Sequence, residues 1–276
     1  MKIAAITRNP KNSPNMAEKD LAILQSTATL LRNRGITVDI LKESEYTGEE
    51  YYDIIFHMSR NDNTLAMLEQ AQKNGARVIN SASAVRQCER EAFTMILHKN
   101  NIAQPPYHIL DNNSLPPETG YPMWLKKCKG WSCHPHDVCM ATNKDETQEA
   151  INSFRARGTQ RILCCKHIQG DIVKFYGVAD KFFHWQYPDA QKTKFGLEKL
   201  NGAIQRYTFD CDKLKSMAHA AAQAIGIEIF GGDCIITPEG DIVIIDFNDF
   251  PSFSSCHNEA ASAIADIITT PKTDNE

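Results

Sequence analysis

GGDCII at residues 231–236 and IVIIDFN at residues 242–248 are apolar runs separated by the turn sequence Pro238-Glu239-Gly240-Asp241. This pattern predicts a β-hairpin that brings Asp233, at the start of one strand, close to Asp246 and Asn248 at the end of the other. Because side chains alternate along a strand, Asp246 and Asn248 share one face. Two carboxylates and an amide oxygen suit a hard divalent cation that also binds phosphate. Alternatively, all three are ordinary turn residues at strand ends.

A second apolar run, PMWLK at residues 122–126, predicts a strand that ends in Lys126. The loop at residues 128–136 follows it. A lysine in this position can hold nucleotide phosphates as a point charge, although strand lysines are commonly just solvated.

The amino-terminal part, residues 1–80, alternates strand and helix patterns. Such alternation predicts a parallel sheet flanked by helices. The expected strands are 2–6, 37–41, 53–57 and 77–80, and the expected helices are 17–34 and 65–73.

The remainder of the chain has a mixed pattern that predicts an α+β arrangement. We expect helices at 83–100, 145–157, 212–225 and 258–268, and strands at 123–127, 137–142, 161–168, 172–178, 228–237 and 240–246. The polar, basic stretch 192–205 is expected to be a mobile loop, and the tail at 271–276 to be disordered.

The bulk composition restricts the class of protein. A net charge of −4 argues against a general nucleic-acid or anionic-membrane surface, and the apolar runs are too short to span a membrane. Nine cysteines without regular spacing fit a reducing cytoplasm better than a disulfide framework. Neither the charge nor the cysteine pattern argues against a homo-oligomer.

Taken together, these motifs resemble the ATP-grasp superfamily over nearly the whole chain. The resemblance rests on Asn80-Ser81 before a helix bearing Cys88-Glu89-Arg90, on residues 102–106, on residues 122–126, on the run 162–170 followed by Asp171, and on Asp233, Asp246 and Asn248. It implies an α/β and α+β fold with five parts: an N-terminal parallel α/β domain (1–82), a connecting helix and link (83–119), a lid subdomain (120–180), a C-terminal metal-binding subdomain (181–271) and a disordered tail (272–276).

The resemblance also implies cofactors and site residues. ATP and Mg²⁺, or Mn²⁺, would bind between the lid and the C-terminal subdomain. Asp233, Asp246 and Asn248 would hold the metal, and Lys174 would meet the transferred phosphoryl group. The ATP-binding residues would be Arg90, Lys126, Lys166, His167, Ile168 and Asp171.

Further residues are candidates for binding an anionic substrate. Lys192 and Lys194 lie in the basic stretch, and Ser252 and Ser254 precede the last helix. The alternatives are a solvated loop and an ordinary helix cap.

The lid loop departs from the family pattern. It reads GWSCHPH at residues 130–136, with one glycine where the family is glycine-rich, and Arg90 and Lys166 replace a lysine and an acidic residue. The same region holds five soft ligands that suggest zinc, but no matched second pair stands at typical spacing. We favour a redox-sensitive or packing cluster for Cys128, Cys133, His134, His136 and Cys139.

The resemblance implies a carboxylate–amine or carboxylate–thiol ligase that acts through an acylphosphate on a small molecule or peptide. The alternative is an inositol-phosphate-type kinase, because the sequence IDFNDFP at residues 245–251 also resembles that branch. A third possibility, suggested by the glycine-poor lid loop, is a nucleotide-binding module with little catalysis.

Overall fold

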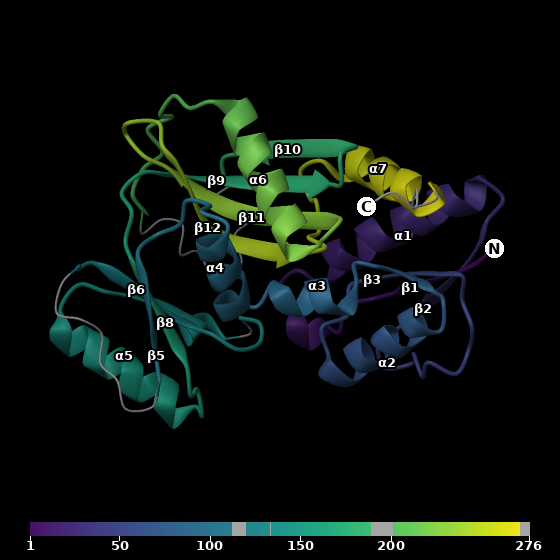
Figure 1. The fold of residues 1–276 in the computed structure, drawn as a ribbon, viewed down its shortest axis with the longest axis horizontal. Helices are drawn as coiled ribbons and strands as arrows, with labels where there is room; N and C mark the ends of the chain where they lie inside the picture. Colours follow the sequence, from purple (N-terminus) through teal and green to yellow (C-terminus); the bar gives the residue numbers. More distant parts are fainter. Residues whose placement is uncertain (112–119, 133, 189–200, 271–276) are drawn as a thin grey trace.

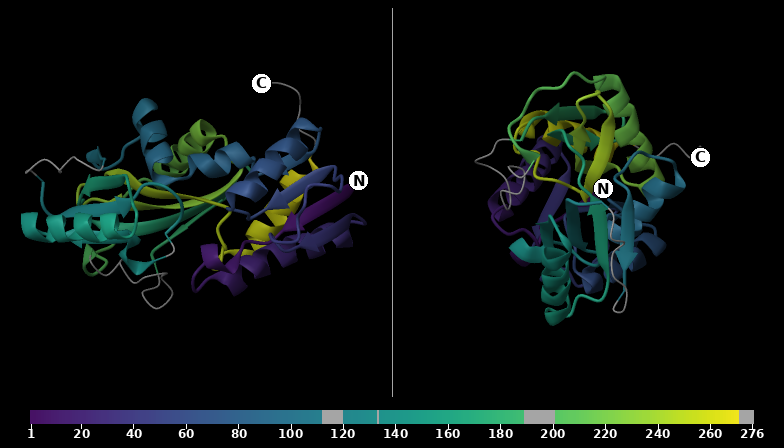
Figure 2. Two further views of the ribbon diagram at one scale, coloured as in Figure 1. Left: turned by 90° about the horizontal axis from the view of Figure 1, so that it is seen from below. Right: turned by 90° about the vertical axis from the view of Figure 1, so that its left-hand side faces the viewer.

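The computed structural model describes residues 1–111, 120–132, 134–188 and 201–270, which form three four-stranded sheets with packed helices (Figure 1). The N-terminal unit and the lid unit lie at opposite ends, and the C-terminal sheet lies between them (Figure 2). Most of the expected mobile loop at 192–205, and the expected tail at 272–276, fall outside the described residues.

The N-terminal unit contains the predicted parallel sheet, in the strand order β2-β1-β3-β4. Alternation along β1 places Ile3 and Ala5 in one hydrophobic cluster and Ala4 and Ile6 in another, so both faces of the sheet are buried. Its elements are β1 (Lys2–Ile6), η1 (Pro10–Asn12), α1 (Ala17–Asn33), β2 (Thr37–Leu41), β3 (Ile54–His57), α2 (Asp62–Lys73) and β4 (Arg77–Ile79).

The last helix, α7 (His257–Thr269), packs against this first unit. Ala260, Ile264 and Ile268 of α7 share one core with Ile3 of β1 and Leu24 of α1. Figure 1 shows α7 beside α1. The N-terminal sheet therefore buries one of its faces against residues from the other end of the sequence.

The connecting segment contains two helices, α3 (Ala82–Gln87) and α4 (Arg90–Lys99), where the sequence predicted one helix at 83–100. That prediction was wrong because Glu89 has an extended backbone, with φ −63° and ψ 140°, and starts a new helix. Ser81 caps α3, since its hydroxyl accepts a hydrogen bond from the Ala84 N–H. The break leaves Arg90 in the first turn of α4.

The lid unit is an antiparallel sheet, in the order β5-β8-β6-β7, covered by α5. Strand β5 was not expected, because it begins directly after Pro105-Pro106, which marks a break in the sequence pattern. The elements are β5 (Tyr107–Leu110), β6 (Met123–Lys127), η2 (Pro135–Asp137), β7 (Val138–Ala141), α5 (Lys144–Ala156) and β8 (Ile162–Lys166).

The C-terminal sheet is antiparallel, in the order β10-β9-β11-β12, with α6 packed on one face. Strand β10 (Phe182–Gln186) was not expected, because its residues are all partly exposed and lack an alternating pattern. The other elements are β9 (Asp171–Val178), α6 (Cys211–Ile225), β11 (Ile229–Ile236) and β12 (Ile242–Asp249).

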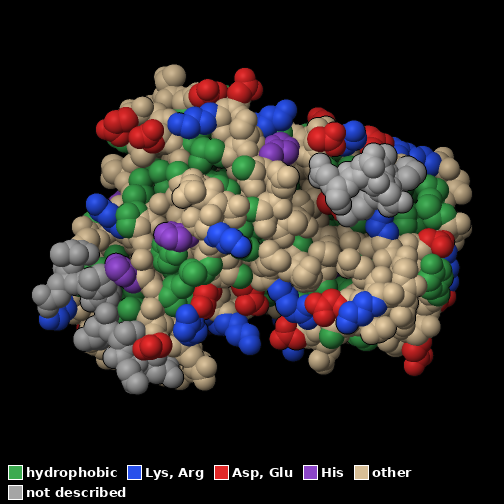
Figure 3. Space-filling view, viewed as in Figure 1, with side chains coloured by type: hydrophobic (Ala, Val, Ile, Leu, Met, Phe, Trp, Pro, Cys, Tyr) green, Lys and Arg blue, Asp and Glu red, His purple; other side chains and the backbone are tan. Residues whose placement is uncertain are grey.

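In the view of Figure 3, basic and acidic side chains are interspersed over the described surface. Neither sign of charge dominates this face. Among the described residues, no helix is both long enough and apolar enough to span a membrane. The expectations about nucleic acid, membranes and oligomers stay predictions.

The buried His57 predicts a pH dependence of stability. Its Nε2 donates to the Asn80 carbonyl oxygen at 2.7 Å and its Nδ1 accepts from the Ser59 N–H. Burial lowers the pKa of His57 to about 4. In the unfolded chain the pKa is about 6.5, so that state binds more protons between these values. The free energy of unfolding should therefore fall as the pH drops from about 6.5 to about 4, by up to about 3 kcal/mol.

Urea unfolding of His57→Gln across this pH range tests that prediction, with the exposed His108→Gln as control. The wild type and His108→Gln should share the acid loss, and His57→Gln should lack this component. Identical pH profiles for all three proteins would contradict the assignment.

Candidate functional site

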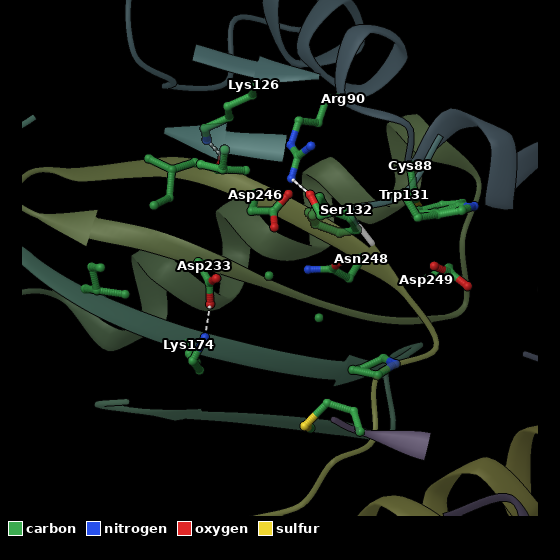
Figure 4. A pocket seen from close by; sticks show the side chains of 18 of the residues that line it. Cys88, Arg90, Lys126, Trp131, Ser132, Lys174, Asp233, Asp246, Asn248 and Asp249 are labelled. Carbon is green, nitrogen blue, oxygen red and sulfur yellow. Dashed lines mark hydrogen bonds and ion pairs between the residues drawn. The ribbon is translucent and has the colours of Figure 1, made fainter. Parts of the chain in front are cut away.

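The predicted hairpin brings the three proposed metal ligands together. Asp233 of β11 lies directly opposite Asp246 of β12, and Gly231 lies opposite Asn248. Figure 4 shows Asp233, Asp246 and Asn248 around one space. The register shifts between Asp233 and Cys234, so that Ile245 is an extra residue in β12. Such a bulge redirects the strand, here beside the candidate ligands.

Lys174 extends this row of charges onto β9. It lies opposite Asp233 in the sheet, and its Nζ lies 3.0 Å from Asp233 Oδ1. The side chains are 21% and 24% exposed, so the pair is accessible from the cavity. Lys174, Asp233 and Asp246 therefore stand side by side on three neighbouring strands, with one positive charge among two negative ones.

Asp233, Asp246 and Asn248 fit a divalent cation. They offer carboxylate and amide oxygens on one face, which is the donor set that Mg²⁺ prefers when phosphates and waters complete its shell. Asp246 has no ion pair among the described residues, so its charge is available to a cation.

Two basic residues face these ligands from the lid side. Lys126 Nζ donates to the Ile245 carbonyl oxygen at 3.1 Å, at the bulge itself. Arg90 donates to Ser132 Oγ at 2.6 Å and to the Lys127 carbonyl oxygen at 3.1 Å. The Arg90 Nε is buried and finds no partner in the described part of the chain. Both cations are therefore placed to bind anions in the space between the sheets (Figure 4).

The hinge after β8 forms the far end of the same space. His167 accepts a hydrogen bond from Trp124 Nε1 at 3.1 Å, and burial lowers the pKa of His167. Ile172 and Ile235 lie nearby in the sheet, opposite one another. Trp124, Ile172 and Ile235 give this end an apolar wall suited to a flat ring. The sequence motifs did not identify this wall.

All these groups line one cavity of about 670 Å³. Of the predicted site residues, it is lined by Arg90, Lys126, Lys166, His167, Ile168, Lys174, Asp233, Asp246, Asn248, Ser252 and Ser254. Asp171 does not line it: its carboxylate accepts hydrogen bonds from the Gln205 and Tyr207 N–H groups at 2.8 and 3.0 Å. Lys192 and Lys194 lie outside the described residues.

The opposite end of the cavity, called here its N-terminal end, contains residues that the sequence reasoning missed. Asp249 is 1% exposed and binds two arginines, Arg8 at 3.1 Å and Arg60 through Nε at 2.8 Å. Arg8 also binds Asp20 at 3.1 Å. Burial raises the pKa of Asp249, but the attraction of Arg60 and Arg8 outweighs it, and the net shift is downward.

A sequence signal for these arginines did exist. Arg8 and Arg60 follow closely after β1 and β3, at the carboxyl ends of parallel strands, where ligands of open α/β sheets bind. Lys19 also lines this end and has no ion pair among the described residues. The N-terminal end is therefore rich in fixed charge, with Ser252 and Ser254 beside it.

Among the described members of the cysteine and histidine cluster, Cys128 and Cys139 pack in the lid, whereas His134 and His136 are exposed. Cys128 is fully buried and packs against Leu163 and Cys165. Burial raises the pKa of Cys128 to about 12 and that of Cys139 to about 11, which disfavours thiolates. No trio of Cys, His, Asp or Glu that could hold a metal occurs in the described residues, and Cys133 lies outside them.

Comparison with known proteins gives a consistent set of relatives. No protein-family model matches the chain. A probable alpha-L-glutamate ligase of Cellvibrio japonicus is 22% identical over 219 residues, which are 76% of this chain and 72% of the relative.

Solved structures match over almost the full length. An ATP-grasp RimK domain protein of Sphaerobacter thermophilus has a TM-score of 0.69 at 15% identity, over 98% of this chain and all of that one. A D-alanine–D-alanine ligase of Bacillus anthracis has a TM-score of 0.72 at 12% identity, over 96% of both chains. The protein therefore has the ATP-grasp fold, with structural similarity to RimK-type proteins and D-alanine–D-alanine ligases.

Proposed function

We propose that the protein is an ATP- and magnesium-dependent ligase that joins a carboxylate to an amine, or to a thiol, on a small molecule or peptide. The observation that carries the proposal is the cavity in which Asp233, Asp246 and Asn248 face Lys126 and Arg90. Carboxylates that hold a cation opposite basic residues that bind phosphates form a phosphoryl-transfer site. The names of the relatives, which are ligases, support the same reaction class.

The mechanism follows from the positions of the chain's own residues. Bound Mg²⁺ supplies charge neutralisation at the phosphates, with Asp233, Asp246 and Asn248 as its protein ligands. Lys126 and Arg90 bind the phosphates from the lid side. The apolar wall at Trp124 and Ile235 takes the adenine ring.

The reaction itself needs no covalent nucleophile from the protein. A substrate carboxylate oxygen attacks the γ-phosphorus and ADP leaves, which gives an acylphosphate. An amine then attacks the carbonyl carbon, inorganic phosphate leaves, and the amine loses a proton. Lys174 lies beside Asp233, where it can bind the transferred phosphoryl group, so catalysis rests on positioning and charge.

ADP release tests the proposal directly. The purified protein is given Mg-ATP and L-glutamate, with hydroxylamine as the amine that converts an acylphosphate into a hydroxamate. ADP and hydroxamate formed in equal amounts, both dependent on the carboxylate, are the expected result. A panel of other amino acids and dipeptides follows if glutamate is inactive. Absence of Mg-ATP binding at millimolar concentration would sink the proposal.

Replacing Lys126 should weaken nucleotide binding. We expect Lys126→Gln to raise the Kd of Mg-ATP about 10-fold, because a charge-assisted phosphate contact is lost. Lys127→Gln is a matched control, since the neighbouring side chain on β6 does not line the cavity. Isothermal calorimetry measures both, and equal affinities for the two variants would contradict the role of Lys126.

One feature favours a second function, a kinase that phosphorylates a hydroxyl. Residue 246 is aspartate, and the run from Ile245 to Pro251 resembles that of inositol polyphosphate kinases. A phosphorylated polyol formed without a carboxylate would support this kinase. Tight Mg-ATP binding with no acceptor-dependent turnover would instead support a nucleotide-binding module.

A further inference from the structure

The segment at residues 128–132 of the lid loop contacts the cavity wall through two consecutive side chains. Ser132 accepts a hydrogen bond from Arg90, which we assign to the phosphates. Trp131 lies against Arg60, whose Cζ stands 3.9 Å from the centre of the indole ring. Both loop residues line the cavity, so one short segment contacts the phosphate side and the N-terminal end (Figure 4).

The guanidinium group of Arg60 is contacted along one edge and on one face. Its Nε and one Nη donate to Asp249, and the indole of Trp131 covers the guanidinium plane. The other nitrogen, Nη1, makes only a long contact of 3.5 Å with the Asn12 carbonyl oxygen among the described residues. The side chain is 7% exposed and lines the cavity, so this donor is available to a substrate anion.

Trp131 provides a contact that a glycine-rich loop would lack. With one glycine, the backbone of this loop approaches phosphates less closely, but the Trp131 indole gives the loop a large flat contact surface. A guanidinium over an indole face is attracted to the ring, and its orientation is fixed by the ring plane. Arg60 comes from the N-terminal unit, and Asp249 directly follows Asn248 of the metal site.

We propose that Trp131 is a positioning residue that orients Arg60 for a substrate anion, so that the seated lid loop completes the N-terminal end of the cavity. The inference rests on the proposed ligase reaction, since it gives Arg60 a carboxylate-bearing substrate to bind. It predicts that Trp131 affects the substrate and the coupling of ATP use to product, and has little effect on nucleotide affinity.

A pair of substitutions separates orientation from packing. Trp131→Phe keeps an aromatic face for Arg60, whereas Trp131→Leu fills part of the space without one. We expect Trp131→Leu to raise the KM for L-glutamate about 10-fold or more and to lower the hydroxamate formed per ADP. Trp131→Phe should stay within about 3-fold of wild type, and both variants should bind Mg-ATP within about 3-fold of wild type. Trp185→Phe, outside the cavity lining, is the control.

Equal KM values and equal product yields for Trp131→Phe and Trp131→Leu would overturn the inference and assign Trp131 to packing alone. If the wild type shows no turnover, only the ligase proposal fails. Fluorescence then tests the contact between Trp131 and Arg60. The part of the emission lost in Trp131→Phe reports Trp131, one of three tryptophans. Acrylamide should quench this part more strongly in Arg60→Lys than in wild type, because the stacked guanidinium is gone. Equal quenching would overturn the inference.

Discussion

Replacing Asp246 with asparagine should reduce acceptor-dependent turnover of Mg-ATP by at least about 100-fold. Residues outside the first coordination shell of a metal typically contribute about 10- to 100-fold, and a ligand should contribute more. Asp233 shares its charge with Lys174, 3.0 Å away, so Asp246 provides most of the negative charge that faces a cation. The amide keeps the shape of the carboxylate and removes that charge.

The same change should leave the fold intact. Asp233 and Asp246 are like charges on opposite positions of a hairpin, and removing one relieves repulsion. The thermal midpoint of Asp246→Asn should therefore equal or exceed that of wild type. Calorimetric titration with Mg²⁺ or Mn²⁺ in the presence of ADP should show weakened metal binding. Glu239→Gln, at an exposed position in the turn of the same hairpin, is the control. Wild-type turnover in Asp246→Asn would show that the metal site lies elsewhere.

Removing the buried carboxylate of Asp249 should have the largest effect on stability. The Asp249→Ala variant leaves Arg8 and Arg60, 6% and 7% exposed, without their shared partner. Breaking one side of a buried ion pair typically costs about 3–5 kcal/mol, because an uncompensated charge stays buried. Urea unfolding at neutral pH measures the change.

A surface pair provides the comparison. Arg34 and Asp266 also join an arginine near α1 to an aspartate, at 2.6 Å, but their side chains are 37% and 50% exposed. Asp266→Ala should cost at most about 1 kcal/mol. The two variants should differ by several-fold in their effect, and similar small losses would mean that Asp249 is not essential to the packing of the two arginines.

The pH dependence gives an independent check on Asp249. Its pKa is lowered in the folded protein, so its contribution is present above the ordinary carboxylate pKa and is lost as the pH falls through the folded value. The stability gap between wild type and Asp249→Ala should therefore narrow in acid. A gap that is constant down to the lowest measurable pH would contradict a role for the ionised carboxylate.

Local sequence patterns were sufficient to predict the part of the candidate site that one hairpin forms. Asp233, Asp246 and Asn248 are brought together by two strands and a short turn, and alternation along a strand fixes their face. Strand–helix alternation similarly predicted that the strands of the first sheet run parallel.

The N-terminal end of the cavity could not be found in this way. Arg8, Arg60 and Asp249 come from three distant segments, and each is an ordinary polar residue until the chain folds. The family motif led to Asp171 as an ATP ligand, but the sheet turns its carboxylate towards the Gln205 and Tyr207 backbone. Tertiary contacts decide such cases, and neither periodicity nor spacing reports them.

The packing of α7 on the first sheet has a consequence for synthesis on the ribosome. Ile3 and Leu24 are translated long before Ile264 and Ile268, which share their hydrophobic core. Domains commonly fold in order as the nascent chain appears, and this one lacks part of its core until α7 has left the exit tunnel. Until then, part of the apolar core of the first unit stays uncovered.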